Sequence, residues 1–290
     1  MATGVAVGSI AVIRRRYLGA VALLATLGCA AAAQAQQAVR LPSVDGKPPA
    51  ALAATLFKPP STRGPLPAVA IFHGCGGVGV NVTRMAQRLA GRGVAALLVD
   101  SFGARRIKDA CTRHWPTVAQ AEDRTRDIDA AVAWLKSQPF VASDRIAVMG
   151  YSYGGGVVLM RTLRRALAVR AVIAVYPDCA LPDSDAAALA VRQPTLLALA
   201  ALDDWTPVRQ CEAMLARLGE GRDRVEHRTY AGAYHSFDAV GLPVTYLAAA
   251  GNRSKPNNCC GAHYGYNAAA YAQFLQDLDA FVDRHLRAER

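Results

Sequence analysis

Five short apolar runs constrain the fold of this chain more than any other feature of its sequence. They are PAVAIFHG, VAALLVDS, RIAVMGYS, AVIAVYPD and PTLLALAALDD, at positions 67–74, 94–101, 145–152, 171–178 and 194–204. Almost continuous hydrophobicity is typical of strands in a parallel sheet that is covered on both faces. Helical patterns fall between the runs, so the sequence predicts a mostly parallel, doubly wound α/β sheet flanked by helices. Two more runs, 36–43 and 51–57, are predicted to add edge strands.

Two of the predicted helices have recognisable features. Thr117 and Gln120 form a capping box before the helix that contains Ile128 and Leu135. The last helix is predicted to start near Asn267 and to carry one apolar stripe, formed by Tyr271, Phe274, Leu275, Leu278, Phe281 and Val282. We expect both apolar faces to pack in the core and give them no functional role.

The first 35 residues differ from the rest of the chain. They contain no acidic residue, and Arg14, Arg15 and Arg16 precede an alanine-rich apolar run that ends at Ala33-Gln34-Ala35. This order is typical of a cleaved signal peptide. A retained membrane anchor is the alternative, but the run is short for a span of roughly 20 residues. The sequence therefore predicts a signal peptide at 1–35, a single domain at 36–290, and export to the periplasm or the medium.

Charge and composition restrict the partners. Removal of the three N-terminal arginines lowers the formal net charge from +11 to +8. The remaining basic residues alternate with acids, as in AEDRTRDIDA, and form no basic stripe. Such a pattern is typical of a solvated surface, so no nucleic-acid partner is expected. The export route, which includes a lipoprotein alternative at Cys29, stays open.

Six cysteines remain after the signal segment: Cys75, Cys111, Cys179, Cys211, Cys259 and Cys260. An even number in an exported protein predicts disulfides. Metal sites of the paired-thiolate kind need spacings such as C-x-x-C, which the sequence lacks. No metal and no organic cofactor are therefore expected.

The motif Gly150-Tyr151-Ser152-Tyr153-Gly154 lies where the run RIAVM meets a predicted helix. In this strand–turn–helix context, G-x-S-x-G is typical of a nucleophile elbow. The glycines allow the close backbone approach of a sharp turn that exposes the serine hydroxyl. A plain turn between two elements is the alternative; the context favours Ser152 as a nucleophile.

A serine hydroxyl needs a base and an acid that orients the base. His235, in AYHSFD, follows the last strand pattern and begins a loop, so it is the predicted base, with His263 as the competitor. Asp203, at the end of TLLALAALDD, is the predicted acid. Its neighbour Asp204 is expected to point elsewhere, and Asp178 in YPDC is a weaker candidate.

Acyl transfer also needs donors for the developing oxyanion. The predicted donors are the backbone N–H of Tyr153 and that of Cys75 in the loop HGCGGV. A glycine-rich loop can instead bind phosphate, but the sequence has neither G-x-G-x-x-G nor the lysine of a P-loop here.

These motifs together resemble one family. HGCGG, VDSFG, GYSYGGG, YPDC, LDDWTP and AYHSFD occur in an order that makes residues 40 to 286 similar to the dienelactone hydrolase family of α/β-hydrolases, in an exported branch with a serine nucleophile. The resemblance implies the α/β-hydrolase fold, with Ser152 as nucleophile, Asp203 as acid and His235 as base. The namesake enzymes use a cysteine nucleophile and a glutamate near the oxyanion loop. This chain has neither, so the resemblance implies the reaction class rather than dienelactone as substrate.

Loop lengths add a prediction about the substrate pocket. About 15 residues separate YPD from PTLLA, too few for a large lid domain. Two other loops, 102–118 and 239–266, are long, and long loops are often functional. The second is predicted to rim the site. Its Tyr264 and Tyr266 are candidate substrate-lining residues together with Tyr151 and Asp178; for the two loop tyrosines, covering the last helix is the alternative.

The sequence therefore predicts a serine hydrolase that cleaves a small carboxylic ester or lactone through an acyl-enzyme. A peptidase or an acyltransferase with the same three residues is one alternative. A small-molecule-binding protein without turnover is another.

One disulfide is predicted, between Cys179 and Cys211. Each follows one of two strands expected to be neighbours, so both would lie at the carboxyl edge of the sheet. Such a bridge needs Cα atoms about 4.4–6.8 Å apart. Two free buried thiols are the alternative, and the other four cysteines are left unassigned.

Overall fold

The computed structural model describes residue 1 and residues 35–42, 51–59, 64–112, 118–180 and 189–287. The predicted signal segment and its cleavage site therefore lie almost entirely outside the described residues, as does Thr117 of the predicted capping box.

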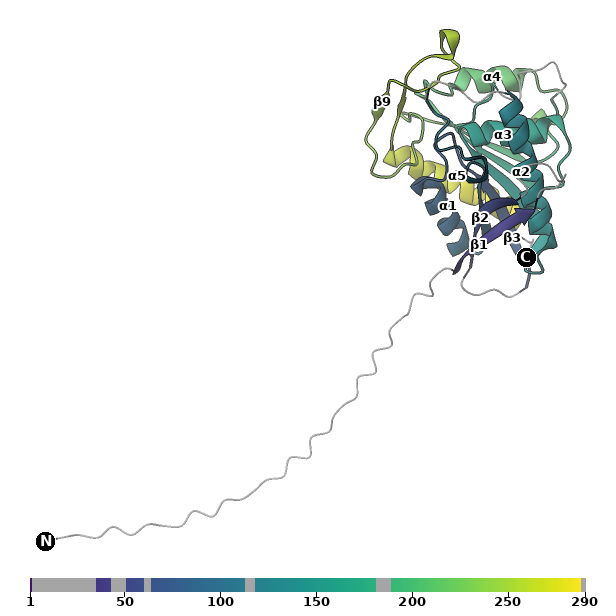
Figure 1. Ribbon diagram of the computed structural model, residues 1–290, viewed down its shortest axis with the longest axis vertical. Helices are drawn as coiled ribbons and strands as arrows, with labels where there is room; N and C mark the ends of the chain where they lie inside the picture. Colours follow the sequence, from purple (N-terminus) through teal and green to yellow (C-terminus); the bar gives the residue numbers. More distant parts are fainter. Residues whose placement is uncertain (2–34, 43–50, 60–63, 113–117, 181–188, 288–290) are drawn as a thin grey trace. The chain divides into compact units, whose positions relative to one another are not determined.

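An eight-stranded sheet forms the centre of the fold (Figure 1), in the order β1-β2-β4-β3-β5-β6-β7-β8. The strands from β4 to β8 in this order run parallel, whereas β1 pairs antiparallel with β2, and β2 antiparallel with β4. Their bounds are β1 Ala35–Pro42, β2 Ala51–Lys58, β3 Leu66–Phe72, β4 Ala95–Asp100, β5 Val141–Tyr151, β6 Ala171–Val175, β7 Thr195–Ala200 and β8 Val225–Tyr230.

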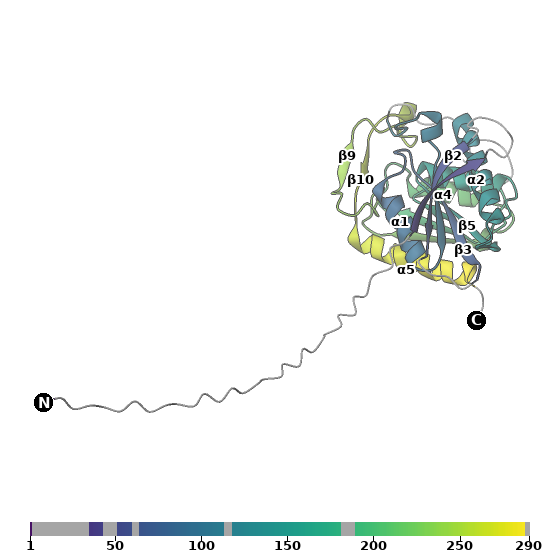
Figure 2. The same ribbon diagram turned by 60° about the horizontal axis from the view of Figure 1, so that its bottom comes forward.

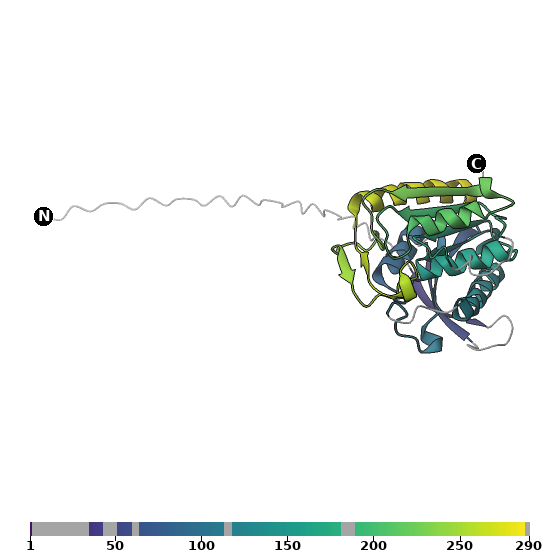
Figure 3. The same cartoon turned by 90° about the horizontal axis from the view of Figure 1, so that it is seen from above.

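Helices cover both faces of this sheet (Figure 1, Figure 3). Val69 and Ile71 of β3 pack in one apolar cluster with α1 and α5, and Ala70 and Phe72 face a second cluster with α2 and α3. A third cluster joins α4 to α3 and to β6 and β7. The described α-helices are α1 Val80–Gly91, α2 Val118–Ser137, α3 Tyr153–Arg164, α4 Val208–Ala216 and α5 Ala268–Leu286. The predicted doubly wound α/β sheet is confirmed.

The five apolar runs form β3 to β7, and the apolar residues of these strands are buried; β5 also includes two exposed residues, Ser143 and Asp144. The two flanking runs form β1 and β2. The last helix starts where the sequence predicts, because the side chain of Asn267 accepts a hydrogen bond from the Ala270 amide and caps α5. Phe274 and Leu278 of its apolar stripe lie in the core.

The long segment 239–266 contains a small second sheet, which the sequence analysis does not predict. β9 (Thr245–Leu247) pairs antiparallel with β10 (Ala262–Tyr264), and Figure 2 shows the two strands side by side. Strands of three residues are too short to produce a recognisable alternation of polar and apolar residues. β10 reaches the main body of the molecule through a bridge between His235 and Tyr264.

The two long loops contact each other. Thr112 forms a bridge with Ala250, and the Gly251 amide donates a hydrogen bond of 2.8 Å to the Cys111 carbonyl. The described part of the first loop, 102–112, therefore lies against the second loop beyond the carboxyl ends of the strands. Among the described helices, none combines the length and the hydropathy of a segment that crosses a membrane.

Candidate active site

The turn between β5 and α3 has the sharpness that the glycines predict. Ser152 lies between the strand and the helix with φ of +53°, in a region that residues with a side chain rarely adopt. A β-carbon on Gly150 would overlap the Gly154 carbonyl, and one on Gly154 would overlap the carbonyls of Phe72 and His73. The turn therefore requires glycine at both positions and places Ser152 at the carboxyl edge of the sheet.

His235 connects Ser152 with Asp203. Its Nε2 lies 2.8 Å from Ser152 Oγ, and its Nδ1 lies 2.8 Å from Asp203 Oδ2. All three side chains are buried, with 5% or less of their surface exposed. Asp203 Oδ1 accepts hydrogen bonds from the amides of Trp205 and Thr206. A carboxylate in this position fixes the tautomer in which Nδ1 carries the proton, so that Nε2 can accept the serine proton.

The loop after β3 lies directly over the serine. A β-carbon on Gly74 would come within 3.2 Å of Ser152 Cβ. His73 Nδ1 lies 2.7 Å from the Gly74 carbonyl oxygen, and His73 Nε2 accepts a hydrogen bond from the Ser101 amide. Because the carbonyl and the following N–H of a trans peptide point in opposite directions, holding the Gly74 oxygen also orients the Cys75 N–H.

His73 keeps this role because it is neutral. Burial, followed by the nearby Arg124 guanidinium, lowers its pKa to about 3. Nδ1 therefore carries the ring proton and donates it to the Gly74 carbonyl, while Nε2 remains an acceptor. Arg124 Nη2 in turn donates to the His73 carbonyl at 2.9 Å.

A disulfide supports the same loop from outside. Cys75 is bonded to Cys111 with a Cα–Cα distance of 4.9 Å, and the Ala110 amide donates to the Cys75 carbonyl. This pairing could not be predicted, because nothing in the sequence places the segment after β4 beside the loop after β3.

The matching family model is that of the dienelactone hydrolase family, and it covers residues 52–285. The chain belongs to the dienelactone hydrolase family. The predicted membership of this family is therefore confirmed, and so is the predicted reaction class, a hydrolase of esters or lactones.

Three similar proteins share between 18% and 27% of their residues with this chain. A Bradyrhizobium protein named "Probable 2-oxo-3-(5-oxofuran-2-ylidene)propanoate lactonase" is 27% identical over 194 residues, which cover 61% of this chain and 76% of that protein. The dienelactone hydrolase structure from Anabaena variabilis has a TM-score of 0.61 and 19% identity, and covers 88% of this chain and 99% of its own. Thermogutta terrifontis esterase 2 has a TM-score of 0.59 and 18% identity, over 88% and 97% of the two chains. At these identities the two structures establish the fold.

A pocket of about 170 Å³ opens above Ser152. Besides the serine and His235, its lining includes Gly74 and Cys75 from the loop after β3, and Tyr151, one of the predicted substrate-lining residues. The lining residues that were not singled out from the sequence include Asn81, Tyr176 and Trp205. Tyr176 and Trp205 occur in the motifs YPDC and LDDWTP, so position within those motifs was the signal that could have identified them.

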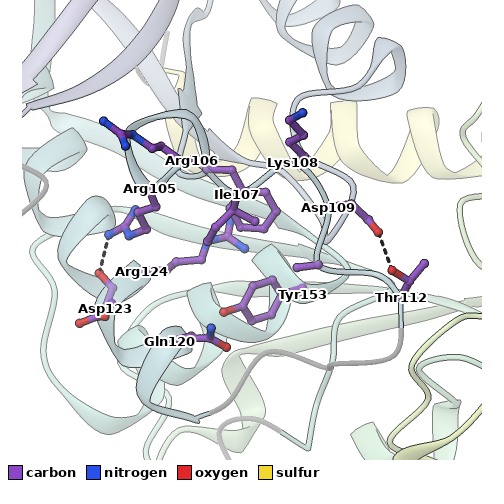
Figure 4. Close-up of a pocket in the computed structure, with 12 residues that line it drawn as sticks. Arg105, Arg106, Ile107, Lys108, Asp109, Thr112, Gln120, Asp123, Arg124 and Tyr153 are labelled. Carbon is purple, nitrogen blue, oxygen red and sulfur yellow. Dashed lines mark hydrogen bonds between the residues drawn. The ribbon is translucent and has the colours of Figure 1, made fainter.

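A larger cavity, about 570 Å³, lies beside the same serine turn (Figure 4). Its lining comes from the segment 102–112 after β4, from α2 and from Tyr153, the residue that follows Ser152. Arg105 on this wall is held by Asp127, with both of its terminal nitrogens 2.8 Å from a carboxylate oxygen. The cavity thus adjoins both the Ser152 turn and, through Ala110, whose amide donates to the Cys75 carbonyl, the loop of Cys75.

The other predicted lining residues lie outside the 170 Å³ pocket. Asp178 is buried and accepts a hydrogen bond from the Ala180 amide, and its own amide donates to the Ser152 carbonyl. Tyr264 packs edge-on against Trp205, which in turn packs against His235. Tyr266 packs against Tyr271 of α5, the covering role that the sequence analysis left open.

The structure pairs the predicted cysteines and places Asp204 away from the serine. Cys179 and Cys211 form a disulfide with a Cα–Cα distance of 4.9 Å, after the paired strands β6 and β7. Cys259 is paired with its neighbour Cys260. Asp204 points to the competitor histidine, with His263 Nδ1 2.8 Å from Asp204 Oδ2. In the described part of the chain, no group of three His, Cys, Asp or Glu side chains has the arrangement of a metal site.

Proposed function

We propose that this protein is a serine hydrolase that cleaves a small carboxylic ester or lactone through an acyl-enzyme on Ser152. One observation carries the proposal: the unbroken line of hydrogen-bond distances from Ser152 Oγ through His235 to Asp203, each 2.8 Å. The family supports the reaction class, and the strained serine turn supports the nucleophile.

In the first half of the reaction, Ser152 Oγ forms a bond with the substrate carbonyl carbon while its proton passes to His235 Nε2. Asp203 stabilises the imidazolium that results. The negative charge on the carbonyl oxygen faces the N–H groups of Cys75 and Tyr153, and one such donor typically contributes about 3 kcal/mol to the transition state. His235 then gives its proton to the departing alkoxide as the carbon–oxygen bond breaks.

In the second half, water loses a proton to His235 Nε2 and attacks the acyl-serine. The bond to Ser152 breaks, the serine recovers its proton from His235, and the acid is released. With a lactone the alkoxide stays attached to the acyl group, so a single hydroxy acid is the product. The mechanism uses only groups of this chain and water.

The two cavities suggest how the substrate is accommodated. The 170 Å³ pocket over Ser152 has room for the reacting ester group and a short substituent. The 570 Å³ cavity at Tyr153 would receive the larger part of the molecule, and its aromatic walls, Phe102 and Tyr153, favour an unsaturated or cyclic group. The lactonase name of the Bradyrhizobium relative supports a lactone as one substrate to test.

We also propose that the protein acts after export, as a single domain that begins near residue 36. The disulfides Cys75–Cys111 and Cys179–Cys211 support an oxidising compartment. N-terminal sequencing of protein secreted by a bacterial host tests the cleavage after Ala35.

The test of the function is product analysis with three substrates of matched acyl group: a lactone, a linear ester and an amide. We expect acid release from the first two, with a burst of alcohol from an activated ester as the acyl-enzyme accumulates. Faster turnover of the amide would favour a peptidase. Transfer to an added alcohol in preference to water would favour an acyltransferase. No turnover of any of the three would reject the proposal.

A further inference from the structure

The mechanism above leaves one buried carboxylate beside the catalytic histidine unused. Asp238 lies three residues after His235 and has only 2% of its surface exposed. Its Oδ1 accepts a hydrogen bond of 2.7 Å from the Tyr176 hydroxyl, and its Oδ2 accepts one of 3.2 Å from Asn81 Nδ2. Buried carboxylates are costly, so both acceptors being satisfied is what allows Asp238 to remain there.

Tyr176 connects this carboxylate with His235. Its ring centroid lies 4.6 Å from that of the imidazole, at an angle of 59°. Its φ of +35° is unusual for a residue with a side chain. Backbone strain of this kind persists only where the surroundings hold the residue in place, and it is frequent at functional sites. Here the hydroxyl is held by Asp238, and the Tyr176 carbonyl accepts a hydrogen bond from Thr206.

The titratable groups around Asp238 indicate which of them its carboxylate can stabilise. Burial raises the pKa of Asp238 above its ordinary value, and the hydrogen bonds from Tyr176 and Asn81 and the positive form of His235 limit this rise. The other groups that face it are phenols: burial and then the Asp238 charge raise the pKa of Tyr151, Tyr176 and Tyr271. The positive charges of Arg84 and Arg88 on α1 lower the pKa of Tyr271 and so partly offset this rise. Among the described residues, no lysine or arginine forms an ion pair with Asp238.

The nearest group to gain a positive charge during turnover is therefore His235. It becomes an imidazolium each time it takes a proton from Ser152 or from water. An aromatic ring in contact with a cation, and an opposite charge nearby, both stabilise the protonated form. The Tyr176 ring supplies the first of these, and the carboxylate that holds its hydroxyl supplies the second.

We propose that Asp238 is a second positioning carboxylate for His235, which acts through Tyr176 to stabilise the imidazolium and to hold the ring against it. This inference rests on the proposed function, since it concerns the same histidine. Asp203 fixes the tautomer by direct contact; Asp238 supports the charged form from the opposite end of the Tyr176 side chain.

The test is Asp238→Asn, which keeps the shape and an acceptor for Tyr176 but removes the charge. We expect kcat to fall about tenfold with less than a twofold change in KM, because ground-state binding does not involve Asp238. A histidine that loses a nearby negative charge protonates less readily, so the acidic limb of kcat/KM against pH should move down by about half a pH unit or more.

The matched control is Asp277→Asn. Asp277 also accepts a hydrogen bond from a tyrosine, Tyr230, at 3.1 Å, but that ring packs on Phe237 and Phe274 rather than on His235. This variant should leave the pH profile in place. If Asp238→Asn does not fold, Tyr176→Phe takes its place. This variant keeps the aromatic ring but removes the hydroxyl that donates to Asp238, so it destabilises the ionised carboxylate. The acidic limb of kcat/KM should therefore also move to lower pH.

The pH profile is measured twice, by ester turnover and by the rate at which a fluorophosphonate labels Ser152. A wild-type protein that neither turns over nor labels refutes the proposed function. An active wild type whose acidic limb is unmoved in Asp238→Asn, or moves equally in Asp277→Asn, refutes this inference alone.

Discussion

Two adjacent aspartates, Asp203 and Asp204, each hold a histidine at the same distance. His235 Nδ1 lies 2.8 Å from Asp203 Oδ2, and His263 Nδ1 lies 2.8 Å from Asp204 Oδ2. Judged by the acid–imidazole contact alone, the two pairs are equivalent, and either histidine could serve as a base.

The two Asp–His pairs differ in burial and in the residues around them. The side chains of His235 and Asp203 are 2% and 1% exposed, whereas those of His263 and Asp204 are 41% and 37% exposed. The free nitrogen of His235 meets Ser152, and the ring packs against Tyr176 and Trp205. His263 packs instead against Tyr234 and Tyr246.

The second pair has a structural use. Asp204 Oδ1 accepts the backbone N–H of His263, and its carbonyl accepts hydrogen bonds from Asn252 and Ser254. These bonds fasten the segment 239–266 to the turn that carries Asp203. The two pairs thus differ in burial and in a third partner rather than in the Asp–His contact, and on these grounds we propose His235 as the proton acceptor and His263 as a structural contact.

The largest expected effect is that of Ser152→Ala. This variant removes the hydroxyl that contacts His235 and that has no counterpart beside His263 among the described residues. Ester turnover should fall by about four to six orders of magnitude, with an unchanged circular dichroism spectrum. The double variant Ser152→Ala/His235→Ala should lose little more, because the two residues act in one step. Turnover within tenfold of the wild type would show that another nucleophile operates.

Asp203→Asn breaks the first pair while the second stays intact. An asparagine side chain can present its amide to Nδ1 and stabilise the wrong tautomer, so kcat should fall by about three to four orders of magnitude. Steady-state kinetics with an ester measure this. A loss below tenfold would mean that the acid has been assigned to the wrong residue.

The protonation of His73 should make the folded protein less stable in acid. Its folded pKa of about 3 lies below the ordinary value of 6.5, so between these values the unfolded chain binds more protons and stability falls as the pH falls. The full depression corresponds to several kcal/mol. Urea unfolding at pH values from 7 to 4 should show a falling free energy of unfolding. The decrease of this free energy with pH should be shallower in His73→Asn. Parallel slopes for the two proteins would contradict the neutral assignment.

Asp204→Asn should have the smallest effect. The asparagine still accepts the His263 amide, and a half-exposed ion pair contributes about 1 kcal/mol or less. Turnover should stay within about threefold of the wild type, and the melting temperature should fall by about 2–4 °C. A kinetic loss comparable to that of Asp203→Asn would mean that the Asp204–His263 pair takes part in the chemistry.

The strands and the serine turn could be predicted because their signals are local. The continuous hydrophobicity of Ala68–Phe72 and the glycines around Ser152 are determined by neighbouring contacts within one short stretch. The positions of Asp203 and His235 directly after strand patterns, together with the chain order, then placed both residues at the carboxyl edge of the sheet. The geometry now seen around them agrees with that placement, and their catalytic role is a proposal for experiment.

The contacts that could not be predicted join distant parts of the chain. The pairing of Cys75 with Cys111 and the hydrogen bond from Arg124 to His73 depend on how the segment after β4 and helix α2 pack, which no local pattern encodes. The same holds for Asp238 and Tyr176, 62 residues apart. β9 and β10 were missed because strands of three residues have no period to detect.

The central claim is that His235, and not His263, activates Ser152. The most direct measurement is the rate of fluorophosphonate labelling in folded wild-type protein, His235→Ala and His263→Ala, followed by intact mass and peptide mapping. We predict one label per chain, on Ser152, at similar rates in the wild type and in His263→Ala, and almost none in His235→Ala. Labelling of Ser152 that survives His235→Ala but is lost in His263→Ala would contradict the account.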